Sequence, residues 1–552
     1  MRTTKALLFG VVALALVACQ DMDVTNPNNP NQTSVQESPE DLETLIATSY
    51  LTFFDRTQQN NAALTAATIS GSFGGGFGCF GTLERSSEPR VPITTIQGAG
   101  NQAHFFPWRE WYSAIAAANT GLRAIEEGDV VIRSGGSDQT QRARAFAKFV
   151  QGISHGYVAK SFDQGYVFSE SVASDTLGFT GNNRQVQGLL RPYPEVADTA
   201  LAQLQVALDI IQEHNVSIPS QTPERWISGM SLSPAEFQQL IHTYMARIVA
   251  YLPRTREEKG ANDWERVLFH LDRGWNGDVV VAGAPGIVQH NFQRLIARQR
   301  ATNPSDHIRP NYETIGVADQ SGGFQDWWAT PWQNRTPWTM EVEDLRIVDP
   351  NRTPVVPQAD QGEGLYLGHH IANIWAAERG TAHRSYYYWH RFGTGNSWQD
   401  GPLVIITEAE LDLLRAEAYM WLGQPAMAVP LINKTRVANG GLDPVTLDGA
   451  PMNENGYCTP RKFNGDCGSL WDALRWEKAI ETMGTEGYIS WWDRRGWQGL
   501  VQGTELHWPM PLADQELLEI SVYTMGGGQG DSAPAPDPER CPPAVSNLAR
   551  CP

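Results

Sequence analysis

The sequence is poor in the residues that hold metals or nucleotides, and it is poor in positive charge. Its 6 cysteines among 552 residues include no CxxC pair and no Cys/His pairs at metal-site spacing, which argues against zinc. No GK[ST] motif is present, so a P-loop is excluded. Lys and Arg number 42 against 61 Asp and Glu, and the net charge of −19 disfavours nucleic acid as a partner. We therefore expect no cofactor, no metal and no nucleic-acid ligand.

Long hydrophobic runs are absent except near the N-terminus. There, Arg2 and Lys5 precede an apolar stretch of 13 residues, Ala6 to Ala18, which is too short for a membrane span and typical of a secretory signal. The letters LVAC that end at Cys19 resemble the bacterial lipobox. This resemblance implies a signal peptide over 1–18, acylation of Cys19 and stable attachment to a membrane through the acyl chains. A chance cysteine at an ordinary cleavage site is the alternative.

Composition divides the rest of the chain into a tether, a body and a tail. Residues 19–39 are rich in Pro, Asn, Ser and Gln and predict a flexible tether, whereas 40–525 predict the folded body and 526–552 a Gly/Pro-rich tail. Export from the cytoplasm would permit disulfides. The simplest pairing joins neighbouring cysteines and leaves Cys79 single and buried. The two predicted bridges join Cys458 to Cys467 and Cys541 to Cys551.

Apolar residues at helical spacing predict an all-α body. One stripe ends at Gly128, and further helical patterns cover 142–162 and 194–214. The first stripe consists of Trp108, Trp111, Ile115, Ala118, Leu122 and Ile125. Capping boxes at Ser233 and Thr407 predict two more helix starts. The segment from 410 to 441 is typical of a tetratricopeptide hairpin, and we expect such hairpins to pack as a superhelical stack.

Residues 275–400 lack this periodicity and predict a large irregular region rich in loops. Long loops in compact proteins are often functional. Within the region, the letters GGFQDWWATPWQNRTPW place indoles among polar groups. A sugar ring offers an apolar face to an indole and a polar rim to carboxylates and amides. The candidate ligand-binding residues here are Asp326, Trp327, Trp328, Trp332 and Trp338; a tryptophan-rich core plug is the alternative.

Three further motifs receive structural interpretations. The letters GISHG at 152–156 match GxSxG, but helical sequence precedes them, so close helix packing is favoured over a hydrolase nucleophile. The letters GFGCFG at 76–81 match GxGxxG without the strand that a dinucleotide site needs. Asp493, Arg494 and Arg495 lie beside tryptophans and predict a buried ion-pair and cation–π cluster.

In their order along the chain, these segments resemble the SusD/RagB family of nutrient-binding outer-membrane lipoproteins. After the lipobox, WREWYSAIAAANTGL is similar to the early W-x-x-x-Y-x-x-I-x-x-A-N helix of the family. IITEAELDLLRAEAYMWLGQ and LINKTRVANGGLDPV are similar to its late tetratricopeptide hairpin. LRWEKAIETMGTEGYISWWDRRGWQGL and LHWPMPLADQELL resemble its closing segments.

The resemblance implies a helical fold without catalytic residues and a function in nutrient uptake. It implies a cell-surface lipoprotein that binds a glycan or a peptide and delivers it to a TonB-dependent outer-membrane transporter. Family ligand contacts come from the counterparts of 71–106, which contain Phe77 and Asn101, and of 320–340. A helical-fold glycoside hydrolase and a tetratricopeptide adaptor for other proteins remain the alternative functions.

Overall fold

The structure is a computed structural model that describes most of the body of the chain. The described residues are 38–57, 60–74, 88, 90, 98–134, 136–172, 186–222, 224–282, 292–293, 296, 308–351, 364–371, 385–392 and 402–522. The predicted signal peptide, most of the tether, the tail, Phe77, and Cys19, Cys79, Cys541 and Cys551 lie outside them. Asn101 belongs to a described helix, but its side chain is not among the described ones.

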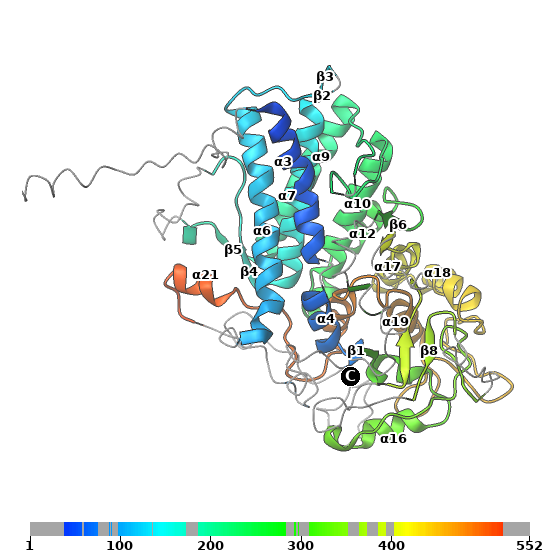
Figure 1. The fold of residues 1–552 in the computed structure, drawn as a ribbon. Coiled ribbons are helices and arrows are strands. Elements are labelled where there is room, and N and C mark those ends of the chain that lie inside the picture. The colour runs from blue at the N-terminus through cyan, green and yellow to red at the C-terminus, as the bar shows by residue number, and fades with distance from the viewer. Residues whose placement is uncertain are drawn as a thin grey trace, which may run out of the picture.

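Helices build most of the described fold, which confirms the predicted all-α class (Figure 1). In the first half these are α3 (Pro39–Thr57), α4 (Asn60–Ile69), α6 (Gly98–Glu126), α7 (Thr140–Ser161), α9 (Tyr193–His214), α10 (Pro234–Tyr251), α11 (Arg256–Gly260) and α12 (Trp264–Leu271). In the second half they are α15 (Tyr312–Ile315), α16 (Gly323–Ala329), α17 (Glu408–Trp421), α18 (Pro425–Ala438), α19 (Leu470–Glu481), α20 (Ile489–Gly496) and α21 (Leu512–Leu517). The short 3-10 helices η1 (Gly316–Ala318) and η2 (Trp332–Asn334) flank α16.

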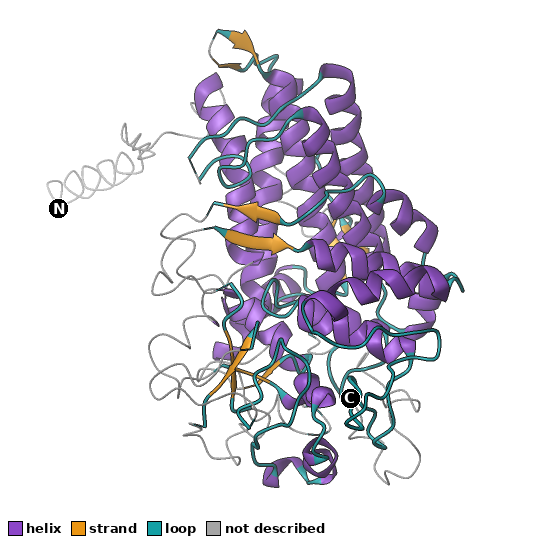
Figure 2. Ribbon diagram, turned by 90° about the vertical axis from the view of Figure 1, so that its right-hand side faces the viewer, coloured by secondary structure: helices purple, strands orange, loops and turns teal. Residues whose placement is uncertain are grey.

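The strands are short and form antiparallel pairs. They are β1 (Phe73–Gly74) with β7 (Arg309–Pro310), β2 (Arg133–Ser134) with β3 (Ser137–Asp138), β4 (Gln164–Tyr166) with β5 (Leu190–Pro192), β6 (Val279–Val281) with β10 (Leu403–Ile406), and β8 (Leu367–His369) with β9 (Tyr387–Trp389). The long helices stand side by side in one half of the molecule, and many of the loops lie at the other end (Figures 1 and 2). Within the described residues, no helix is both long and apolar enough to cross a bilayer.

Close helix packing explains the GxSxG match on α7. A Cβ on Gly152 would lie 2.5 Å from Leu204 on α9, and one on Gly156 would lie 2.4 Å from Ile248 on α10. These distances are shorter than any van der Waals contact, so glycine permits the helices to approach. Ser154 is fully buried in the middle of α7, which confirms the packing interpretation and excludes an exposed nucleophile.

The two predicted capping boxes have different outcomes. Ser233 accepts a hydrogen bond from the backbone N–H of Glu236, and the Glu236 carboxylate accepts one from the N–H of Ser233. Thr407 caps α17 by accepting from Glu410, but the Glu410 side chain turns inward and binds Arg247 at 2.7 Å. The second capping box is therefore only half formed, because a buried cation competes for the carboxylate.

Acid should destabilise the fold through its buried histidines. Burial lowers the pKa of His155 to about 4, although its ring hydrogen-bonds Gln203 at 2.8 Å. In the unfolded chain the imidazole takes up a proton near its ordinary pKa of 6.5, whereas in the folded chain it stays neutral until about pH 4. The contribution to stability is therefore complete above pH 6.5 and is lost as pH falls toward about 4. We expect urea midpoints to fall between about pH 7 and about pH 4.5, and to fall less in His155→Gln. Equal pH slopes for both proteins would contradict this assignment.

Candidate functional site

The tryptophan segment folds as a short helix instead of an open loop. Gly322 has a φ of +85° and precedes α16, while the Asp319 carboxylate accepts hydrogen bonds from the N–H groups of Phe324 and Glu341. This geometry turns Phe324 and both α16 tryptophans inward. Trp327 is 4 % exposed and Trp328 is 2 % exposed. The prediction that these two indoles offer exposed faces is therefore wrong.

Arg335 covers the two buried indoles. Its guanidinium lies 4.3 Å from the ring of Trp327 and 4.9 Å from that of Trp328, and it binds the Glu88 carboxylate at 2.6 and 3.0 Å. The cation neutralises the carboxylate while its flat face packs on the rings. A ring held in this way cannot stack on a sugar, so Trp327 and Trp328 belong to the core in agreement with the alternative interpretation.

The remaining candidates of the segment have mixed environments. Trp338 is half-buried and stacks on Tyr312 with 3.8 Å between ring centroids. Trp332 is half-buried on η2, and Asp326 is exposed on α16. These residues do not converge on the aromatic platform that the sequence predicts, although Trp332 and Asp326 are reachable from solvent.

A pocket opens next to this segment, between α15, the loop before α19, and the helices α19 and α20. Its cavity volume is about 50 Å³ for the centres of water-sized molecules, and the open space around that cavity, solvent included, is about 710 Å³. The lining residues are Glu313, Thr314, Val317, Pro460, Arg461, Lys462, Phe463, Asp472, Arg475, Trp476, Ala479, Thr482, Ser490, Asp493, Arg494 and Trp497. Aromatic rings, cations and carboxylates thus meet around one space.

A disulfide-closed hairpin, residues 458–467, forms one wall of the pocket. Cys458 and Cys467 are joined with a Cα–Cα distance of 5.6 Å, which confirms the first predicted bridge. The N–H of Arg461 donates to the carbonyl of Val317 at 2.7 Å and fixes the hairpin to η1, which precedes the tryptophan segment. The Phe463 ring lies 5.2 Å from that of Trp328. Trp328 therefore supports the pocket wall from behind.

Two anchored tryptophans form the inner part of the pocket. The indole N–H of Trp476 donates to Asp344 at 3.0 Å, and that of Trp497 donates to Glu417 at 2.7 Å. Both rings are almost completely buried and touch the pocket. Their hydrogen bonds fix the ring planes, so the two buried indoles form a rigid floor behind the pocket.

A buried ion cluster supports this inner part. Burial opposes the ionised form of Glu417, but Lys259 and Lys478 outweigh it and lower its pKa to about 2. Burial raises the pKa of Asp493, and Lys478 at 2.6 Å opposes that shift. Arg494 and Arg495 donate to backbone carbonyls, so the predicted ion-pair and cation–π cluster is confirmed.

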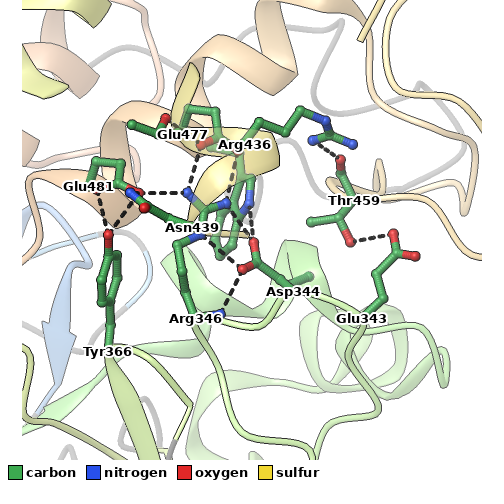
Figure 3. A network of polar contacts seen from close by, with 12 residues as sticks. Glu343, Asp344, Arg346, Tyr366, Arg436, Asn439, Thr459, Glu477 and Glu481 are labelled. Atoms are coloured by element: carbon green, nitrogen blue, oxygen red, sulfur yellow. Dashed lines mark hydrogen bonds and ion pairs between the residues drawn. The ribbon is translucent and has the colours of Figure 1, made fainter. Parts of the chain in front are cut away.

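A second buried network of ion pairs lies on the side of α19 that faces away from the pocket, and it stabilises the fold. Arg346 binds Asp344, Glu477 and Glu481 at 2.6 to 3.0 Å, and all four side chains have no exposed surface (Figure 3).

His369, one of two adjacent histidines, is buried on β8 and contacts Thr339. Among the described residues, no group of three or more His, Cys, Asp or Glu could hold a metal ion.

Sequence reasoning missed most of the pocket. Arg461, Lys462 and Phe463 were visible only as the content of a predicted disulfide loop, and Trp497 only as a neighbour of charged residues. These residues come together through contacts between segments far apart in the chain, such as the hydrogen bond of Arg461 with Val317. No local sequence pattern indicates such contacts.

Comparison with solved structures shows which known fold the chain shares. No protein-family model matches the chain, and no curated protein matches it. A SusD superfamily protein from Parabacteroides distasonis matches with a TM-score of 0.52 and 12% identity, over 87% of this chain and 97% of that one. A SusD-like carbohydrate binding protein from Bacteroides vulgatus matches with a TM-score of 0.50 and 14% identity, over 84% of each chain.

The chain has the SusD-like fold. The likeness extends over most of both chains and includes the helical stack that the sequence predicts. On this SusD-like fold the pocket lies beside the irregular region, between α15 and the C-terminal helices α19 and α20.

Proposed function

We propose that this SusD-like chain is a cell-surface lipoprotein that binds an oligosaccharide and delivers it to a TonB-dependent outer-membrane transporter. The observation that carries the proposal is the pocket in which the half-buried ring of Phe463 meets charged and hydroxyl side chains over a floor of Trp476 and Trp497. Aromatic faces with a polar rim are the chemistry that sugars require. The solved B. vulgatus neighbour is itself described as carbohydrate binding, which supports the assignment.

Binding without bond cleavage fits the pocket better than hydrolysis. A glycosidase needs two carboxyl groups across a cleft, one of which must give up a proton. Glu313 binds Arg90 at 2.9 Å and Asp493 binds Lys478 at 2.6 Å, and both side chains are almost completely buried, so they are poorly placed to reach a glycosidic bond, although burial raises the pKa of Asp493 to about 7. We propose a non-catalytic protein, and release of reducing sugar by the purified chain would support the hydrolase instead.

A glycan panel with one aromatic substitution tests the proposal. We expect the full chain to bind at least one oligosaccharide in calorimetry, and Phe463→Ala to weaken that binding by about tenfold because a stacking surface is lost. Phe269→Ala is the matched control, since Phe269 is 48% exposed on α12, away from the pocket. If no glycan binds, the proposed function fails; if both variants bind alike, the site is elsewhere.

Lipid attachment at Cys19 and delivery to a transporter are tested by separate experiments. We expect Cys19→Ser to move the protein from the membrane to the soluble fraction of the producing cell. We also expect crosslinking in intact cells to join the native chain to a TonB-dependent transporter. Recovery with other proteins alone would favour the adaptor function.

A further inference from the structure

We infer that the pocket selects an acidic oligosaccharide, whose anionic group is bound by Arg461 and Lys462 of the disulfide-closed hairpin. The inference rests on the proposed function and names the class of its ligand. The shared chemistry is an anionic substituent on a sugar ring, either the carboxylate of a uronic acid or a sulfate ester.

The carboxylates that line the pocket are already paired. Glu313 binds Arg90 at 2.9 Å and has Arg494 at 3.9 Å. The Asp493 carboxylate lies 2.6 Å from Lys478. Asp472 lies 3.6 Å from Arg475 and also accepts the N-terminal hydrogen bond of α19 from Ser469. None of these acidic groups is left to balance a further cation of the pocket.

Within the part of the chain that the structure describes, two cations of the hairpin have no carboxylate partner. Arg461 donates from Nε to the amide oxygen of Gln320 at 2.7 Å and from its terminal nitrogen to the carbonyl of Gly456 at 2.5 Å, and both acceptors are neutral. Among the described residues, the Lys462 side chain has no hydrogen-bond or ion-pair partner, and only its backbone makes hydrogen bonds. Both side chains are half-buried in the pocket wall.

This local excess of positive charge contrasts with the whole chain. The net charge is −19, yet Arg461 and Lys462 stand side by side in the pocket wall and neither pairs with a carboxylate of the described part of the chain. A half-buried cation is stabilised by an anion more than by a neutral hydroxyl, because charge-assisted hydrogen bonds are stronger. The acidic body repels a long polyanion at a distance, so a short oligosaccharide with few charges fits best.

The hairpin is rigid enough for such recognition. The disulfide closes it, the N–H of Arg461 is bound to Val317, and the amide of Gln325 donates to the carbonyl of Lys462 at 3.2 Å. Phe463 packs on Phe324 with 5.3 Å between ring centroids. The cations therefore stand beside a fixed aromatic wall, and little ordering is needed when a ligand binds.

Matched pairs of glycans test the charge preference. The probes are oligogalacturonides and their carboxyl-reduced neutral forms, sulfated galactan oligosaccharides without uronic acid and their desulfated neutral forms, and neutral gluco- and xylo-oligosaccharides, each titrated into the full chain. We expect one anionic probe to bind at least about tenfold more tightly than its neutral counterpart, with affinity falling as salt rises. Whether the carboxylated or the sulfated arm responds identifies the anionic group.

Substitutions then locate the preference. We expect Lys462→Gln and Arg461→Gln each to reduce the acidic-to-neutral affinity ratio by about three- to tenfold, while binding of the neutral form changes little. Lys462→Gln is the safer variant for folding, because the Lys462 side chain makes no hydrogen bond or ion pair with the described residues. Arg266→Gln removes an exposed cation of α12 and should leave the ratio unchanged.

Each outcome separates the inference from the proposed function. Equal affinity for the charged and neutral forms, or tight binding of neutral glycans alone, overturns the inference and leaves the proposed function standing. A preference that survives the double substitution of Arg461 and Lys462 overturns the assignment to the hairpin. If no glycan of the panel binds, the proposed function and the inference fall together.

Discussion

Replacing Trp327 by alanine is expected to lower the free energy of unfolding by about 3–5 kcal/mol. The indole is 4% exposed and packs between Phe324 and Tyr312, with ring centroids 6.2 and 5.6 Å away. Removing it leaves a cavity and deprives the Arg335 guanidinium of a ring at 4.3 Å. Urea unfolding followed by circular dichroism measures the loss.

Trp332→Ala provides the control within the same segment. Trp332 is half-buried on η2, so its removal should cost less than about 1 kcal/mol. If Trp327→Ala were as stable as Trp332→Ala and bound glycans more weakly, the indole would be a ligand platform and not a core residue.

The helical framework could be predicted from the sequence because its signals are local. The stripe from Trp108 to Ile125 lies on α6, and Ser233 begins α10 with both hydrogen bonds of a capping box. Apolar spacing and caps act within a few residues of each other, so they can be read without knowledge of the fold.

The candidate site could not be predicted in the same way, because the burial of its side chains depends on residues far away in the sequence. The composition of the tryptophan segment predicts a loop, but the Asp319 carboxylate accepts a hydrogen bond from the first turn of α16, and Glu88 binds Arg335, which lies over the rings. A tryptophan in a Gly/Pro-rich segment is compatible with exposure and with burial alike. Only the tertiary contact with the disulfide-closed hairpin shows that Trp328 supports a pocket.

Arg346→Met should be still more damaging, because it leaves three buried carboxylates without their shared cation. The guanidinium binds Asp344 at 2.7 Å, Glu477 at 2.6 Å and Glu481 at 3.0 Å (Figure 3). Breaking one buried pair costs about 3–5 kcal/mol, and here several are broken at once. Burial already raises the pKa of Glu477 with Arg346 present. We expect the variant to be partly unfolded near neutral pH in thermal and urea unfolding.

The pH dependence of the variant distinguishes lost charge pairing from lost packing. Burial raises the pKa of Glu477 and Arg346 opposes that shift, so removal of Arg346 raises this pKa further. Protonation of Glu477 then favours the folded state, and the deficit shrinks as pH falls toward about 4. A pure packing defect would keep the same deficit at every pH. Arg144→Met is the control, because its pair with Glu126 at 3.1 Å is about one-third exposed (36% and 34%) and should contribute less than about 1 kcal/mol. An equal loss in both variants would mean that burial of the network contributes nothing beyond a surface ion pair.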